Sequence, residues 1–147
     1  HWFSVWKIFV MDKLLVDTNI VLDLLAKRDL FLVEAQELFT FSDKRKVELF
    51  VSSLTFANTY YILSQNLKIQ DARKILRKFK VLVKVISMDD KIIDLSLESD
   101  FKDFEDAIQY FSAIENGIDM IITRNLKDFK TSKIPVLTAK DYVESFK

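Results

Sequence analysis

Short apolar, β-branched segments alternate along the sequence with longer segments of helical periodicity, and this alternation constrains the fold more than any other feature. Strands separated by helices pair in parallel through right-handed crossovers, and the helices cover both faces of the sheet. The sequence therefore predicts an α/β fold, a three-layer sandwich with a central parallel sheet of about five strands flanked by helices. The expected strands cover residues 13–17, 47–51, 81–86, 119–123 and 134–137, and the expected helices cover residues 19–26, 31–46, 53–66, 69–80, 89–99, 103–116 and 138–146.

The chain is expected to form one domain. Its 147 residues suffice for one continuous core, and with a single Gly and a single Pro it offers no evident linker. Met11 directly precedes the first expected strand, so we predict a domain over residues 11–147. Residues 1–10 would lie outside it, either as added upstream residues or as a genuine N-terminal extension. They are apolar but far shorter than the roughly 20 residues of a membrane span, so no membrane segment is predicted.

The residue types that the sequence lacks narrow its chemistry. There is no Cys, and the one His is His1 at the terminus. Cysteine nucleophiles and thiolate zinc sites are therefore excluded, and a Ser-His-Asp relay would depend on a terminal residue. Any reactive groups are expected among Asp and Glu. Because 22 basic residues balance 22 acidic ones, a nucleic-acid site would be local. The lack of Cys fits a cytoplasmic protein.

Polar side chains follow two of the expected strands at their carboxyl ends, where an open parallel sheet presents groups to a ligand. Asp17, Thr18 and Asn19 follow the first strand. A helix-capping turn is an equal alternative there, because all three residue types cap helices well. The segment Thr123-Arg124-Asn125, with Asp128 after it, follows the fourth strand and could bind a metal-bound water and a phosphate. Its alternative is a plain turn rich in Asn and Asp.

The expected helix over residues 103–116 carries two further carboxylates. Asp103 and Asp106 stand three residues apart on one helical edge, and Asp106 borders the apolar stripe. Stabilisation of the first helical turn is the alternative explanation for Asp103. The stripe itself consists of Phe104, Ala107, Ile108, Phe111 and Ile114.

Asn58 falls among apolar residues of the helix expected over residues 53–66. Its neighbours at helical spacing are Leu54, Ala57, Tyr61 and Ile62, which predicts a buried side for this helix. A buried amide needs hydrogen-bond partners. Either neighbouring backbone satisfies Asn58, or its amide faces the carboxylates.

Carboxylates gathered at one sheet edge repel one another, and a hard cation with oxygen ligands relieves this repulsion. Without His or Cys in the domain, the expected ion is Mg²⁺ or Mn²⁺. Such an ion activates water and stabilises charge on a leaving oxygen, which suits phosphoryl chemistry.

Five segments taken in order resemble the PIN-domain ribonucleases, in particular the bacterial branch of VapC-like toxins. They are LLVDTNIVLDLL, SSLTFANTYYIL, DFEDAIQYFSA, IITRNLKDF and IPVLTAKDY, and they run from Met11 nearly to the end of the chain. The resemblance implies a parallel sheet flanked by helices, an acidic pocket for Mg²⁺ or Mn²⁺, and endonuclease activity on RNA.

The resemblance also implies roles for individual residues. Asp17 matches the first acidic residue of the family and Asp106 the later helical one, with Asp103 beside it as a further catalytic and metal-ligand candidate. Asn125 and Asp128 match the last polar cluster, so Asp128 is a candidate metal ligand. Thr18, Asn19, Thr123 and Asn125 would support water or ligands, Asn58 would support the site, and Arg124 would bind substrate phosphate.

One departure leaves alternatives open. Many relatives carry Glu where this chain has Asn58, and an amide supplies no negative charge. A catalytically degenerate module that binds nucleic acid or protein is therefore the alternative to a nuclease. An aspartyl phosphatase or a phosphorylated receiver fits less well, because Asn19 stands where the phosphatase needs Asp and the receiver's acidic residues are absent.

The remaining expectations concern partners. Toxin-type relatives are neutralised by a small antitoxin and often form homodimers, so both partners are implied by resemblance. A basic segment within residues 69–80 could contact RNA, although a solvated helix face explains it as well. Its members are Arg73, Lys74, Arg77, Lys78 and Lys80.

Overall fold

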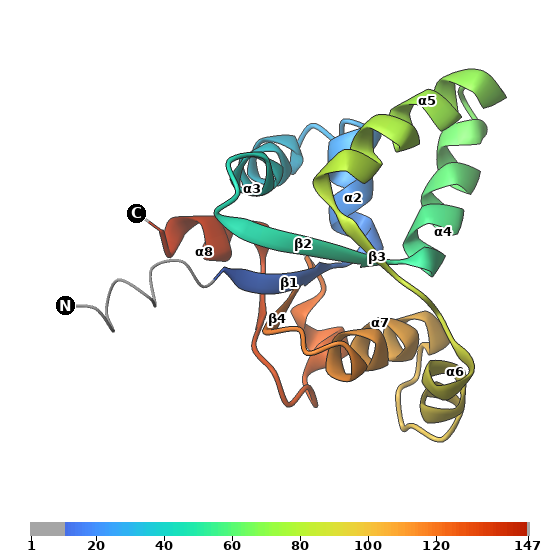
Figure 1. Cartoon of the computed structure of the whole chain (residues 1–147), viewed down its shortest axis with the longest axis vertical. Coiled ribbons are helices and arrows are strands. Elements are labelled where there is room, and N and C mark those ends of the chain that lie inside the picture. The colour runs from blue at the N-terminus through green and yellow to red at the C-terminus, as the bar shows by residue number, and fades with distance from the viewer. Residues whose placement is uncertain (1–10, 147) are drawn as a thin grey trace.

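The computed structural model describes residues 11–146, which form a five-stranded sheet in the order β3-β2-β1-β4-β5 (Figure 1). Every neighbouring pair of strands is parallel. The expected domain therefore holds the sheet, while the prediction for residues 1–10 lies outside the described part of the chain. The strands are β1 (Asp12–Val16), β2 (Val47–Ser52), β3 (Lys84–Ile86), β4 (Met120–Ile122) and β5 (Val136–Leu137).

Helices cover both faces of this sheet, which confirms the predicted three-layer α/β fold. In Figure 1, α6 and α7 lie below the sheet, and α2, α3 and α5 lie above it. The α-helices are α2 (Thr18–Leu25), α3 (Leu32–Asp43), α4 (Ser53–Ser64), α5 (Ile69–Phe79), α6 (Asp90–Leu97), α7 (Phe104–Glu115) and α8 (Ala139–Glu144), with the 3₁₀ turns η1 (Lys80–Leu82) and η2 (Leu126–Phe129). Among residues 11–146, no helix is long and apolar enough to cross a bilayer.

The central strand β1 shows why its sequence is an uninterrupted apolar run. Leu14 and Val16 pack in the core shared with α2 and α3, whereas Leu15 packs in the core shared with α6 and α7. All three side chains are completely buried. Successive residues of a strand point to opposite faces, so a strand covered on both sides must be apolar at every position.

Three local predictions were wrong. The strand expected over residues 81–86 begins with the 3₁₀ turn η1, and only Lys84–Ile86 pair in the sheet. The strand expected over residues 134–137 is also shorter, because β5 covers only Val136–Leu137. The predicted buried side of α4 was also wrong, because its buried residues are Thr55, Thr59 and Leu63. Ala57 is exposed and Tyr61 is 67% exposed. This helix turns its threonines toward the polar residues at the end of β1, and apolar spacing alone does not reveal that packing.

The strand order places a crevice at the carboxyl edge of the sheet. β1 connects to β2 on one side, and β4 lies on its other side and continues to β5. At such a switch point the loops leave in opposite directions, and ligands of open α/β sheets bind there. The loops that begin at Asp17 and at Thr123 meet at this point, because the Asp17 amide donates to the Ile122 carbonyl at 2.9 Å.

Candidate metal centre

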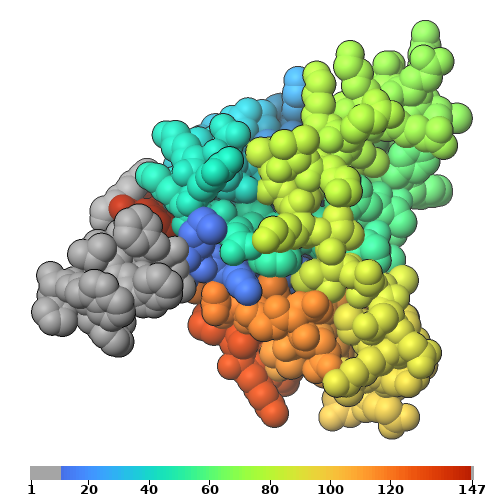
Figure 2. Space-filling view, in the orientation of Figure 1, coloured from blue at the N-terminus to red at the C-terminus, as the bar shows by residue number. Residues whose placement is uncertain are grey.

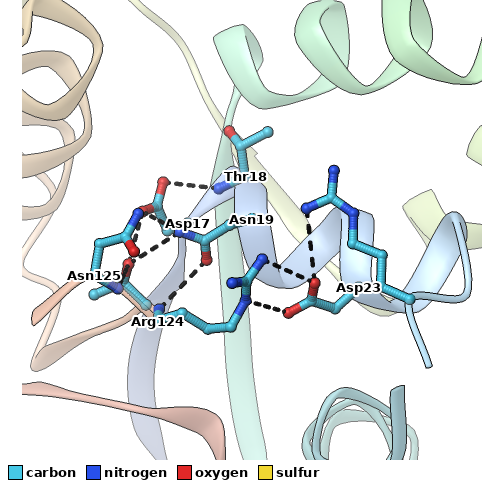
Figure 3. A network of polar contacts seen from close by, with 8 residues as sticks. Asp17, Thr18, Asn19, Asp23, Arg124 and Asn125 are labelled. Atoms are coloured by element: carbon cyan, nitrogen blue, oxygen red, sulfur yellow. Dashed lines mark hydrogen bonds and ion pairs between the residues drawn. The ribbon is translucent and has the colours of Figure 1, made fainter. Parts of the chain in front are cut away.

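Asp17 is a buried carboxylate held by several donors at the end of β1 (Figure 3). Its side chain is only 7% exposed. The Thr18 amide donates to Oδ1 at 2.8 Å, which makes Asp17 the N-cap of α2, and Thr123 Oγ1 donates to Oδ2 at 2.8 Å. Asn19 Nδ2 also donates to Oδ2, at 3.3 Å. Asp17 therefore caps a helix, as the simpler explanation requires, and is also aimed into a polar cluster by three neighbours.

The turn after β4 joins this cluster. Thr123 is completely buried. Its Oγ1 accepts a hydrogen bond from the backbone N–H of Asn125 at 3.1 Å and donates one to Asp17 Oδ2. The Arg124 amide donates to Asn19 Oδ1 at 3.4 Å. Hydrogen bonds thus join the segment after β1 to the segment after β4, more than one hundred residues later in the sequence. We expected this proximity because both segments follow strands at the carboxyl edge of the sheet.

Gln109 is a member of the cluster that the sequence analysis missed. It lies on α7 and is 2% exposed. Its Nε2 donates to Asp17 Oδ1 at 3.3 Å, to Thr18 Oγ1 at 3.3 Å and to Thr55 Oγ1 at 3.0 Å. One amide therefore links β1, α4 and α7. No clear sequence signal points to it, because Gln109 lies outside the apolar stripe predicted for this helix and has the polar Asp106 and Ser112 at helical spacing.

Four more carboxylates line a neighbouring pocket of about 320 Å³: Asp100, Asp103, Asp106 and Asp128. Asp103 caps α7 by accepting from the backbone amide of Asp106 at 3.0 Å, so the capping explanation holds for Asp103 as well. The same pocket is also lined by Lys102, Lys127 and Lys130, so the carboxylates have cationic neighbours.

These carboxylates influence one another's ionisation. Burial, followed by the negative charges of Asp103, Asp17, Asp128 and Glu105, raises the pKa of Asp106 to about 7. Burial also raises the pKa of Asp17 against the lowering effect of its hydrogen bonds, and the charge of Asp128 adds to the rise. The residues predicted as ligands therefore share one strongly negative region.

The donor set fits a hard, partly hydrated cation. Within residues 11–146, no three acidic side chains converge tightly enough to coordinate an ion by themselves. Mg²⁺ usually binds through one or two carboxylates and keeps several waters, so it does not need a complete protein cage. A divalent cation here would also relieve the repulsion that raises the pKa of Asp106. Asp17 and Asp106 are the two carboxylates of this region whose pKa is raised, and the charge of Asp128 contributes to both shifts.

Asn58 lies at the edge of this acidic region. It is half-buried, and its Nδ2 donates to Glu105 Oε2 at 3.3 Å. Its partner is thus a side chain of α7 rather than neighbouring backbone. Position 58 faces the acidic helix without adding a charge to it.

Arg124 points away from the carboxylate pocket. Its Nε donates to Asp23 Oδ2 at 2.8 Å and its Nη2 to Asp23 Oδ1 at 3.2 Å (Figure 3). Its guanidinium lies 4.0 Å from the ring centroid of Phe31. Asp23, which the sequence analysis missed, is 1% exposed and lies in the apolar run IVLDLL. A lone acid on a buried helix face was the signal for it.

The basic residues of α5 lie on the surface. Arg73, Lys74, Arg77, Lys78 and Lys80 are all exposed. Figure 2 shows α5, in yellow-green, on the visible face of the molecule above the sheet. This arrangement is that of a solvated helix face, and it leaves the five cations accessible to a polyanion.

The chain is similar to proteins of one known family. A family model for the PIN domain matches residues 13–127. Ribonuclease VapC1 of Aquifex aeolicus is 31% identical over 142 residues, which cover 90% of this chain and 94% of that protein. A toxin-antitoxin complex from Klebsiella pneumoniae contains a chain with a TM-score of 0.62 and 27% identity, covering 85% of this chain and 96% of that one. VapBC2 from Rickettsia felis, bound to a DNA fragment from its promoter, gives a TM-score of 0.65 at 19% identity over 85% and 96% of the two chains.

Proposed function

This chain belongs to the PIN domain family, and on that premise we propose that it is a divalent-metal-dependent endoribonuclease that hydrolyses phosphodiester bonds of RNA. The observation that carries the proposal is that Asp17 and Asp106 lie in one negatively charged region, where neighbouring carboxylates affect the pKa of each. Both carboxylates have a raised pKa, and each is affected by the charge of Asp128. Strongly perturbed carboxylates in a crevice at the carboxyl edge of a sheet mark a functional site.

The roles of the residues follow from their positions. Asp17 and Asp106 hold the cation, and Asp103 and Asp128 complete its acidic surroundings. A bound Mg²⁺ or Mn²⁺ would supply an activated water and stabilise charge on the phosphate and leaving oxygens. Thr123 and Asn19 keep Asp17 oriented through their hydrogen bonds to Oδ2.

Supporting residues extend this arrangement. Thr18 links Asp17 to α4, because its Oγ1 lies 2.9 Å from Thr55 Oγ1. Asn125 closes the turn on Thr123. Arg124, which was expected to bind substrate phosphate, is paired with Asp23, and we propose that it contacts the substrate from the same turn without binding the phosphate. Lys127 and Lys130, which line the carboxylate pocket, attract the phosphate instead.

The proposal includes a biological setting drawn from the relatives. A ribonuclease and a toxin-antitoxin complex are among the proteins that this chain is similar to. We therefore propose that it is the toxin of a toxin-antitoxin pair, that a small antitoxin protein binds it, that it forms a homodimer, and that it acts on RNA in the cytoplasm.

A second candidate is a catalytically degenerate module that binds nucleic acid or protein. The observation that favours it is Asn58, which faces the acidic helix through Glu105 without adding a charge. A weaker cation site would leave the fold and the crevice intact. The two candidates differ in one property, which is metal-dependent cleavage.

The test is cleavage of a mixed RNA pool by the purified protein in Mg²⁺, in Mn²⁺ and in EDTA, beside Asp17→Asn and Asp106→Asn. Asp43→Asn is the matched control, because Asp43 is an exposed carboxylate at the end of α3 and away from the site. A nuclease cuts in either metal, stops in EDTA, loses activity in both site variants and keeps it in the control. Binding of RNA without any cleavage supports the degenerate module instead.

A further inference from the structure

A second cavity of about 320 Å³ is lined by the turn after β4, whose Thr123 donates to Asp17. Arg124 and Asn125 of that turn line it, together with Phe31, which precedes α3, and Glu34 in the first turn of α3. Ile20, on α2, supplies apolar surface. We call this cavity the Arg124 pocket. It contains none of the carboxylates proposed to hold the cation.

The guanidinium of Arg124 is held as a rigid flat surface in this pocket. Asp23 binds two of its nitrogens from one edge, at 2.8 and 3.2 Å. Phe31 lies against the group, with 4.0 Å between the guanidinium carbon and the ring centroid. Asp23 is itself 1% exposed, and Arg28 Nη1 lies 3.9 Å from its Oδ1. The arginine is therefore positioned before any ligand arrives.

The charges that line the pocket balance one another, so they give a phosphate no excess positive charge and suit a neutral planar group. Asp23 pairs with Arg124, and the carboxylate of Glu34 offsets the ammonium of Lys140. A planar ring can stack on a guanidinium or an aromatic face, and RNA-binding proteins use both surfaces to hold unstacked bases. Glu34 can accept a hydrogen bond from an amino group of the ring, and Lys140 at the rim can donate one.

The position of the pocket relates it to the cutting site. Asn125 lines the Arg124 pocket. Its backbone N–H donates to Thr123 Oγ1, and this hydroxyl donates to Asp17 Oδ2. A strand whose phosphate contacts the cation held by Asp17 could therefore place a neighbouring nucleotide at this turn. Both cavities lie on the same carboxyl edge of the sheet, on either side of the switch point between β1 and β4.

We propose that the Arg124 pocket binds a base of the RNA strand next to the cleaved bond, stacked on the guanidinium of Arg124, which the ring of Phe31 supports from behind. This inference rests on the proposed ribonuclease function and names the part of the substrate that the protein recognises. Single-stranded RNA is then the preferred substrate class, because a base paired within a duplex cannot enter the pocket.

The test combines a change in the protein with a change in the RNA. Phe31→Leu removes the ring beneath Arg124 at a half-buried position, and Phe146→Leu is the matched control at a residue that is 48% exposed and packs on Phe41. A short single-stranded RNA cut at one site is prepared intact and with the base removed, one position at a time, on each side of that site. Cleavage rates are measured in Mg²⁺ for all combinations, and thermal unfolding of each variant is recorded beside them.

We expect one position at which removing the base slows the wild-type protein about 10-fold, equivalent to about 1.4 kcal/mol of stacking. The same removal should slow Phe146→Leu as much as the wild type and Phe31→Leu much less, because Phe31→Leu has already lost the ring that holds the guanidinium flat for stacking. Equal penalties in all three proteins, or no penalty at any position, would overturn the inference while leaving the nuclease intact. A wild-type protein that cuts no RNA in any metal would instead overturn the proposed function.

A peptide of a protein partner is the competing occupant of the pocket. If a peptide occupies the pocket, Phe31→Leu should cut intact RNA and base-free RNA as fast as the wild-type protein cuts each of them. That result would also overturn the assignment to a base.

Discussion

The side-chain amide of Gln109 donates to Oδ1 of Asp17 at 3.3 Å, across 92 residues of sequence. The same nitrogen also donates to the hydroxyls of Thr18 and Thr55. The NH₂ group of Gln109 must be the part that faces Asp17, because a carboxylate oxygen only accepts hydrogen bonds and the carbonyl oxygen of the amide cannot donate one. A neutral residue of α7 thus supports the charge on the carboxylate that we assign to the cation.

Replacing Gln109 with Leu should lower the rate of RNA cleavage by roughly 10-fold or more, since loss of a residue that orients a ligand costs about that much. Activity at saturating RNA and Mn²⁺ affinity should both fall. Ser112→Ala is the control, because Ser112 is also buried on α7 and its hydroxyl has no hydrogen-bond partner among the described residues. Equal losses in the two variants would show that Gln109 acts only through packing.

Asp23→Ala should destabilise the protein by about 3 kcal/mol, because it leaves the guanidinium of Arg124 unpaired beside a buried site. The measurement is the midpoint of urea unfolding. Glu48→Ala breaks an ion pair of the same 2.8 Å length, to Lys84, whose side chain is 69% exposed. That variant should lose less than about 1 kcal/mol. A loss of stability in Glu48→Ala as large as that in Asp23→Ala would contradict the claim that burial makes the Asp23–Arg124 ion pair the stronger contributor to stability.

Stability without metal should fall as the pH rises from about 4 to about 7. Burial and the neighbouring carboxylates raise the pKa of Asp106 from 3.8 to about 7. In this range the folded protein keeps a proton that the unfolded chain has released, so unfolding releases it and a higher pH favours unfolding. Thermal unfolding in EDTA across this range checks the slope. Asp106→Asn should make the slope shallower, with the remainder due to the raised pKa of Asp17, and Asp43→Asn should leave it unchanged. Identical slopes in all three proteins would refute the raised pKa of Asp106.

Asn58→Glu should raise Mn²⁺ affinity and the cleavage rate several-fold. The new carboxylate would face the acidic region from α4, where the amide now donates to Glu105. Added negative charge strengthens cation binding, although repulsion from Glu105 limits the gain. Asn58→Gln tests length without charge and should leave both quantities near their wild-type values. A gain in Asn58→Gln as large as that in Asn58→Glu would exclude charge as the cause.

The sequence was sufficient for the presence and parallel pairing of the five strands, although not for the bounds of β3 and β5, because the signals for strands are local. Leu14, Leu15 and Val16 are apolar in succession, which is the pattern expected of a short strand covered on both faces. The carboxyl ends of β1 and β4 followed from the parallel order, and so did the proximity of Asp17 and Thr123. The resemblance to PIN-domain ribonucleases added the candidate roles of Asp106, Asp103 and Asp128.

The parts that the sequence did not reveal depend on long-range polar packing. Gln109 and Asp23 are recognised through partners 92 and 101 residues away, and neither partner can be read from local periodicity. The buried side of α4 was wrong for the same reason: Thr55 faces Thr18 and Gln109, whereas the more apolar Tyr61 faces solvent. Hydrophobic spacing finds an apolar core, and it misplaces a helix that packs through its hydroxyls.

The central claim is that Asp17 and Asp106 together hold one divalent cation. Calorimetric titration of the RNA-free protein with Mn²⁺ tests it most directly, in the wild type, Asp17→Asn, Asp106→Asn and the control Asp43→Asn. The account predicts binding in the wild type and in Asp43→Asn, with an affinity at least roughly 10-fold lower in each of the other two variants. Equal affinity in all four proteins, or no binding in any of them, would contradict it.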